Sequence, residues 1–166
     1  MKLLDGLRVQ GEVVFTVLSR EPNEHEMFEL LCGYPPRRLL RQQRVANLIT
    51  NTGRSDITSR IINGAAVTIP GWIAVTQTAI VPAATDTTLT GETARKANST
   101  VAVLSTYYSR FVSTFTSADL GAVTVTGAGL FTAAAVGSMW AIVSTSVAKA
   151  ASDSLVVEWR IQTLAS

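Results

Sequence analysis

Four arginines in the N-terminal third are the strongest candidates for surface chemistry in this chain of 166 residues. They fall within eight positions, with leucines between them, at Arg37, Arg38, Arg41 and Arg44. A guanidinium group binds a carboxylate through two parallel hydrogen bonds, so such a cluster can dock on an acidic protein surface. Two other interpretations stay open. The cluster can be the solvated face of a short helix, or it can pair with the four glutamates between residues 21 and 29 of a neighbouring copy.

The arginine cluster does not predict nucleic-acid binding. No aromatic residues alternate with the basic ones, although stacking on bases is the usual companion of phosphate contacts. The rest of the chain also carries little positive charge, because the net charge of the whole sequence is only +2. A protein partner is therefore the better expectation for these four side chains.

The remaining reactive side chains are too few or too scattered to predict an enzyme. His25 is the single histidine and lies between two glutamates, so it offers neither a base beside a nucleophile nor a zinc site. The sequence has no G-x-S-x-G motif and no glycine loop of the phosphate-binding kinds. The carboxylates that a glycosidase would need fall on expected turns or an exposed strand face: Asp86, Glu92, Asp119, Asp153 and Glu158. We expect no catalysis, no metal and no cofactor.

The composition of the chain is typical of proteins that form contacts with partner molecules. Its length suits one core of ordinary size, and Cys32, the lone cysteine, is expected to be a small buried hydrophobe. Charged residues make up 16%, below the roughly 25% typical of soluble domains. No apolar run reaches the roughly 18 residues of a membrane span, and the N-terminus lacks the pattern of a signal peptide. We expect synthesis in a cytoplasm and no membrane partner.

Charge divides the chain into two parts. Residues 1–60 hold 16 of the 26 charged side chains, which predicts an N-terminal arm over residues 1–64 and a separate domain over residues 65–166. In the arm we expect one strand over residues 11–19 and a short helix after Asn23. A second helix is expected over residues 54–62, capped by Thr52 or Ser55 and stopped by Gly64.

Two-residue periodicity predicts that the second part is an antiparallel β-sandwich. The pattern is clearest at the C-terminus, where Leu155, Val157 and Trp159 alternate with Glu158 and Arg160, so that one face meets a core and the other meets water. Seven strands are expected there, over residues 66–69, 71–76, 99–107, 110–117, 122–126, 138–147 and 154–163. With the N-terminal strand they make eight, for which a jelly roll is the common arrangement. The expected core includes Trp72, Phe111, Phe115, Leu130 and Trp159.

Several short segments resemble one group of proteins. They are NLITNTG at 47–53 before a helix, WIAV at 72–75, PAATDTTL at 82–89 with Glu92 and Arg95, GAGLF at 127–131 and the closing strand. Together they resemble small β-sandwich virion proteins of tailed bacteriophages, of the capsid decoration (cement) and tail-fibre type. The resemblance implies a structural role on the virion with the major capsid protein as partner. It also implies a homo-oligomer, and a trimer would match the local three-fold positions of an icosahedral shell.

Of the two roles, decoration is favoured because no collagen-like or coiled-coil extension follows the sandwich. The arginine cluster is then the expected contact with the shell. A tail-fibre or baseplate attachment protein is the first alternative. The second comes from another class: a carbohydrate-binding module that stacks sugars on Tyr107, Tyr108 or Trp140, although these aromatic residues serve equally well as core or subunit contacts.

Overall fold

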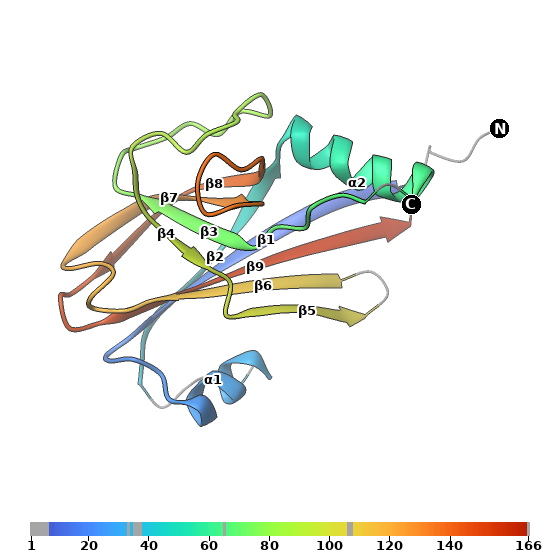
Figure 1. Cartoon of the computed structure of the whole chain (residues 1–166). Coiled ribbons are helices and arrows are strands. Elements are labelled where there is room, and N and C mark those ends of the chain that lie inside the picture. Colours follow the sequence, from blue (N-terminus) through green and yellow to red (C-terminus); the bar gives the residue numbers. More distant parts are fainter. Residues whose placement is uncertain (1–6, 33, 35–37, 65, 106–107, 166) are drawn as a thin grey trace.

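A computed structural model describes residues 7–32, 34, 38–64, 66–105 and 108–165 (Figure 1). The described part is mainly β structure, as the sequence predicts. In chain order the elements are β1 (Leu7–Leu18), α1 (Glu24–Leu31), β2 (Leu39–Ile49), α2 (Asn51–Asn63), β3 (Trp72–Thr76), β4 (Glu92–Ala97), β5 (Thr100–Ser105), β6 (Tyr108–Phe115), β7 (Val123–Phe131), β8 (Met139–Lys149) and β9 (Ser154–Ala165). Neither helix is long and apolar enough to cross a membrane among these residues.

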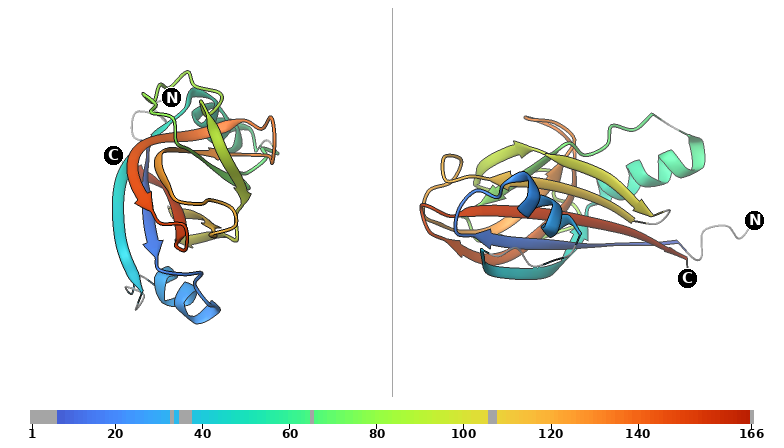
Figure 2. Two further views of the ribbon diagram at one scale, coloured as in Figure 1. Left: turned by 90° about the vertical axis from the view of Figure 1, so that its left-hand side faces the viewer. Right: turned by 90° about the horizontal axis from the view of Figure 1, so that it is seen from below.

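The nine strands form a single antiparallel sheet in the order β4-β3-β7-β8-β2-β1-β9-β6-β5. The sheet is strongly curled, so its two ends face each other across the interior (Figures 1 and 2). Side chains from both halves meet there in one core cluster that includes Phe15, Phe115, Val125, Leu130 and Trp159. The expected core residues are therefore buried, except that Trp72 is only partly buried against a second cluster.

The described strands of residues 1–64 do not form an arm that stands apart from the domain predicted over residues 65–166. Strand β1 pairs with β9 from Leu7–Ala165 to Leu18–Ser154 and with β2 on its other side, so β1 and β2 lie in the middle of the sheet. The reason is that the inner face of β1 is apolar, and Val13 and Phe15 are fully buried. A strand of this kind is stable only with neighbours on both sides.

The outer face of β9 is also buried, although its alternation predicts contact with water. Val156 is 1% exposed, and it packs with Leu18, Val112 and Leu30 in a small cluster beneath α1. Helix α1 therefore lies against the outside of the sheet, below β9 and β6 in Figure 1. It begins after Asn23, whose side chain accepts a hydrogen bond from the N–H of Glu26 as part of a capping box.

Five further expectations about elements differ from the structure. The segment around Arg41 and Arg44, for which a helix face was one interpretation, is strand β2; residues 66–69 are not a strand; and β4 was not expected. The strand expected over residues 122–126 continues through Gly127–Gly129 to Phe131 as β7. Glycine is required at position 127, because a Cβ there would lie 2.4 Å from Ile80. Helix α2 is capped by Thr50, earlier than either expected cap, and stops at Gly64 in the left-handed conformation.

The curl of the sheet is fixed where its two outermost strands meet. Strands β4 and β5 lie at opposite ends of the sheet but are joined by only Asn98 and Ser99. The fully buried hydroxyl of Ser113 on β6 lies 3.1 Å from the carbonyl of Ala97 and 3.1 Å from the Asn98 amide oxygen. The N–H of Ser99 donates to the carbonyl of Val112 at 2.7 Å. These bonds tie β4 to β6 and bring the ends of the sheet together.

Replacing Ser113 with alanine should weaken this junction. The change removes the one hydrogen bond that the buried hydroxyl donates and leaves its acceptor without that donor, so the free energy of unfolding should fall by about 1–3 kcal/mol. Chemical denaturation measures the loss. The control is Ser146→Ala, because Ser146 lies on β8 and is exposed. Equal stabilities of the two variants would show that the junction does not hold the sheet closed.

Candidate docking surface on strand β2

Strand β2 is paired along its full length on one side only. It pairs with β1 from Leu39 to Asn47, but with β8 only at Leu48 and Ile49. Over residues 39–47, the edge that faces away from β1 has no strand partner in the described part of the chain. Many side chains of this segment are therefore exposed to solvent. They are those of Leu40, Arg41, Gln42, Arg44 and Ala46. In the left view of Figure 2, β2 runs along the outside of the curled sheet.

The pattern of β2 explains why it is a strand despite its charges. Val45 packs partly against the main core and Ile49 is buried, while Arg44 and Ala46 point to the other face. This two-residue alternation matches the pleat of the neighbouring strand β1. The partner supplies the remaining stability, since β1 offers a continuous ladder of antiparallel pairs.

The structure spreads the predicted arginines along this strand. Arg37 lies outside the described residues. The Nε of Arg38 lies 3.4 Å from a carboxylate oxygen of Glu26 on α1, and Nη1 of Arg44 lies 3.7 Å from a carboxylate oxygen of Glu12 on β1. Arg41 is exposed and makes no ion pair with any residue that the structure describes. The arginines therefore line an edge about 10 Å long between Arg41 and Arg44 and do not converge on one point.

These ion pairs leave the arginines available to another acid. The side chains of Arg38 and Arg44 are 43% and 56% exposed. The partner of Arg44, Glu12, is also exposed at 39%, and exposed pairs of this kind contribute about 0–1 kcal/mol. Exchanging Glu12 for a carboxylate of a partner would consequently cost little, whereas Glu26 beside Arg38 is only 12% exposed.

An ionic ladder runs from β2 across the outer face of the sheet and becomes buried toward β6. Glu12 on β1 forms an ion pair with Arg44 at 3.7 Å and also lies 3.4 Å from Arg160 on β9. Arg160 binds Glu158 at 2.8 Å, and Glu158 lies 3.6 Å from Arg110 on β6. The side chains of Glu158 and Arg110 are only 5% and 8% exposed. The sequence did not predict this ladder, because it joins strands whose register is set by the fold.

The ladder also anchors helix α1. Nη1 of Arg110 donates a 2.7 Å hydrogen bond to the carbonyl of Leu31, at the C-terminal end of the helix, where a cation is favoured. Burial alone would lower the pKa of Arg160, but its hydrogen bond to Glu158 and the nearby negative charge of Glu12 outweigh burial and raise that pKa. Arg160 therefore stays charged and holds the two carboxylates in place.

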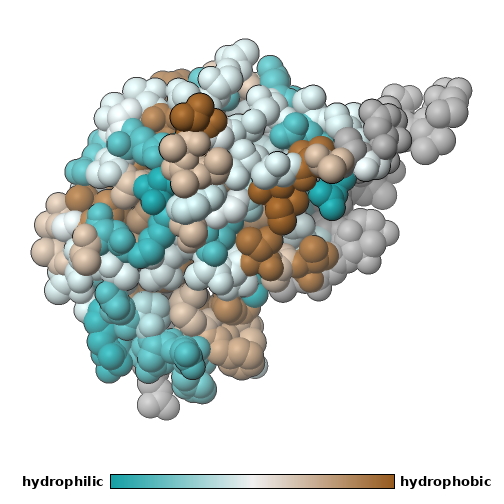
Figure 3. Space-filling model, viewed as in Figure 1, coloured by the Kyte–Doolittle hydropathy of each residue, from teal (hydrophilic) through white to brown (hydrophobic). Residues whose placement is uncertain are grey.

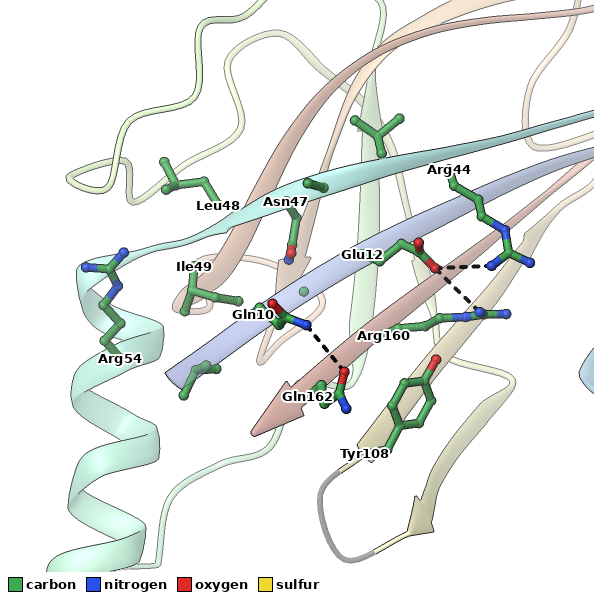
Figure 4. A pocket seen from close by; sticks show the side chains of 14 residues that line it. Gln10, Glu12, Arg44, Asn47, Leu48, Ile49, Arg54, Tyr108, Arg160 and Gln162 are labelled. Atoms are coloured by element: carbon green, nitrogen blue, oxygen red, sulfur yellow. Dashed lines mark hydrogen bonds and ion pairs between the residues drawn. The ribbon is translucent and has the colours of Figure 1, made fainter. Parts of the chain in front are cut away.

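A polar pocket of about 470 Å³ opens where β1 and β2 separate (Figure 4). Its lining includes Arg44, Arg54 and Arg160 against one carboxylate, that of Glu12. The side-chain amide of Asn47 is buried there without a hydrogen-bond partner in the described part of the chain. Neighbouring Gly11 makes room for it, since a Cβ at that position would lie 2.0 Å from the Asn47 oxygen.

Of the aromatic residues considered for sugar stacking, one lines this pocket. Tyr108 lies beside Gln162 and Arg160, and burial raises the pKa of its hydroxyl above the usual value. Tyr107 lies outside the described residues. Trp140 is only 6% exposed, and its indole N–H donates to Asp56 at 2.8 Å, so its ring is not available as a platform.

His25 and Cys32, the single histidine and the single cysteine, lie on α1 and at its end. His25 is exposed, and its Nε2 lies 3.4 Å from Glu29. Among the residues described, no group of three or more histidine, cysteine, aspartate or glutamate side chains is arranged to hold a metal. Cys32 is exposed, not buried as expected, because it follows the last turn of α1.

Glu158→Gln should destabilise the protein strongly. The substitution keeps the shape of the side chain but removes the charge that compensates buried Arg110, so we expect a loss of about 3–5 kcal/mol in the free energy of unfolding. Glu12→Gln is the matched control at the exposed end of the ladder, with an expected loss below about 1 kcal/mol. Urea denaturation of both variants measures the difference. Similar losses would contradict the assignment of Glu158 as the central member.

No protein-family model, no curated protein and no solved structure matches this chain. The function must therefore be inferred from its residues and their arrangement. The feature that stands out is the half-open strand β2 with its arginines.

Proposed function

We propose that this chain is a structural virion protein that decorates the outside of a capsid shell and stabilises it. Its partner is the major capsid protein, and the chain is made in the cytoplasm of the host before it joins the virion. The single observation that carries the proposal is the exposed basic edge of β2, where Arg38, Arg41 and Arg44 lie on a rigid sheet. Such an edge fits an acidic protein surface.

Weak single contacts suit a protein that acts in many copies. Each exposed arginine contributes about 1 kcal/mol or less, so one docking edge alone binds loosely. Copies that are joined to one another bind as a unit, and their combined avidity exceeds that of a single copy without new contacts. A decoration protein of this kind therefore needs a second surface for self-association.

The edge strand β5 is the best candidate for that second surface. Residues 100–105 contain no charged residue, and Val101 and Val103 are 47% and 74% exposed. Figure 3 shows hydrophobic surface over β5 and over the segment that leads into β3, where Ile69 is also exposed. Proteins usually protect edge strands with charges, and the opposite edge strand β4 carries three of them. We propose that β5 joins copies into a homo-oligomer, with a trimer as the expected state.

The curled sheet would act as a two-layer sandwich of the jelly-roll type in this assembly. One layer would hold β2, β1, β9, β6 and β5, and the other β4, β3, β7 and β8. The main core cluster supports this division, because Trp159 comes from the first group and Leu130 from the second. The layers would present β2 and β5 at opposite edges of one surface, since these strands end the first group.

Val103→Lys should reduce self-association. A lysine on the exposed edge adds charge that repels the same residue of a neighbouring copy, so the fraction of oligomer at a given concentration should fall. Light scattering after size-exclusion chromatography measures the molar mass. Val81→Lys is the matched control, because Val81 is 92% exposed in a loop away from the sheet edge. An unchanged molar mass for the Val103 variant would remove β5 from the proposed interface.

Reversing two charges on the basic edge should abolish docking. Arg38→Glu with Arg41→Glu replaces attraction to an acidic surface by repulsion, and binding to purified undecorated shells should weaken by at least about tenfold. Co-sedimentation with the shells measures the bound fraction, and circular dichroism checks the fold. The control Arg54→Glu changes an exposed arginine in the first turn of α2, where a carboxylate is favoured. Binding retained by the double variant would contradict the proposal.

Two alternatives predict different observations. A tail-fibre or baseplate attachment protein would be found at the tail of purified particles, in far fewer copies than a shell protein. A carbohydrate-binding module is favoured by one feature, the place of Tyr108 in a polar pocket with Gln10 and Gln162. Specific binding of the isolated protein to a glycan array would support that second reading.

A further inference from the structure

We infer that the free edge of β2 accepts an extended acidic segment of the partner as an added strand. The inference rests on the proposed function and names how the partner is held. Main-chain hydrogen bonds would supply the registry of the contact, and arginine side chains would select the charge of the added strand.

The backbone of β2 has donors free on this side. At the end of the strand, the N–H of Thr50 donates to the carbonyl of Trp140 on β8 at 2.9 Å. In a regular strand every second N–H points the same way, so those of Ala46, Arg44 and Gln42 also point away from β1. The irregularity in the pairing of β1 with β2 lies outside this stretch, between the pairs Val17–Arg41 and Leu18–Leu39. Three consecutive ladder positions are thus open to a new strand.

Pairing with β1 holds the stretch from Gln42 to Asn47 in an extended conformation before any partner binds. Pairs with β1 run without interruption from Gln42–Thr16 to Asn47–Gly11, and the Gln42 side chain also donates to Thr16 at 3.2 Å. Val45 anchors the strand to the main core. An edge that is already extended and fixed loses little conformational entropy when a strand is added to it.

Charge identifies the partner segment as acidic. Strand β2 contains two arginines and no carboxylate, and Arg38 precedes it. On an added strand, carboxylates opposite or diagonal to Arg44 would lie within reach of its guanidinium group, whereas Arg41, three residues away, points to the other face of the sheet. Leu40, which is 58% exposed, offers an apolar contact beside them.

A second copy of the chain does not fit this edge. An antiparallel pair of β2 strands must be centred on a residue and not between two residues, because opposite residues either both turn their N–H groups to the partner or both turn them away. A pair centred on Arg44 would set the two Arg44 side chains directly opposite each other. Like charges directly opposite each other destabilise a strand pair, and charged side chains on an edge oppose self-association. The arginines therefore disfavour such a pair of copies and favour an acidic strand.

Amide hydrogen exchange of the full-length wild-type chain tests the inference without mutation. The probe is a synthetic peptide of alternating glutamate and valine, and the control is the same peptide with lysine for glutamate. With the acidic peptide at saturation, the amides of Gln42, Arg44 and Ala46 should exchange at least about tenfold more slowly. The lysine peptide should leave them unchanged. Absence of protection at these three amides, or equal protection by both peptides, would overturn the inference.

Ala46→Pro separates the added strand from simple charge attraction. Proline removes a free N–H that faces away from β1, so the fold tolerates it while strand addition is blocked. Binding to undecorated shells should be lost for Ala46→Pro and kept for Ala46→Thr, which retains the N–H. If circular dichroism shows that the proline variant is unfolded, hydrogen exchange of the wild type decides.

The two proposals fail in distinguishable ways. Shell binding that survives Ala46→Pro but not the double reversal at Arg38 and Arg41 would overturn strand addition and leave the docking role intact. Shell binding that survives the double reversal would overturn the docking role itself.

Discussion

The pairing of β1 with β9 is the interaction on which the rest of the structure depends. It joins the two ends of the chain along twelve registered positions, from Leu7–Ala165 to Leu18–Ser154. The inner faces of the pair bury Phe15 and Trp159 completely, and burial of such aromatic side chains is among the largest contributions to a core. Strands β2, β6 and β5 all join the sheet through this pair. Strand β2 is added to β1, and β6 and β5 follow β9.

In this arrangement the exposed edges of β4, β5 and β2 differ in the charges of their side chains. Strand β4 carries charges of both signs, β5 carries none, and the open stretch of β2 carries only positive charge. Since an exposed edge is a template for another strand, its side chains decide which strand is accepted. In the proposed assembly, a neutral edge for its own copies and a basic edge for an acidic partner would give the chain two distinct directions of assembly. The ionic ladder from exposed Arg44 to buried Arg110 connects the basic edge with helix α1.

Much of the sheet could be predicted from sequence, because strands with one apolar face show two-residue alternation. Strands β1, β3, β6, β8 and β9 were expected at nearly their observed places. Strand β2 was missed because it is stabilised by β1 and not by its own composition. The burial of Glu158 was missed for a related reason: the helix that covers it comes from a distant part of the chain, and alternation alone cannot reveal such a cover.

The candidate site was predicted in part. Composition identified the arginines, since a dense basic cluster is visible in any sequence. Their partners were not predictable: Arg44 meets Glu12 and Arg160 only because β1 lies between β2 and β9. The open edge of β2 was equally hidden, because it exists only where β8 diverges after two paired positions.

The most direct measurement is a reconstruction of purified virions by electron cryomicroscopy, with the copies of this chain located and counted. A decoration protein held by its basic edge should give density on the outer surface of the shell in a fixed number of copies per capsid subunit, with β2 nearest to the capsid protein. A shell without this density, or density in which β2 faces solvent, would contradict the account.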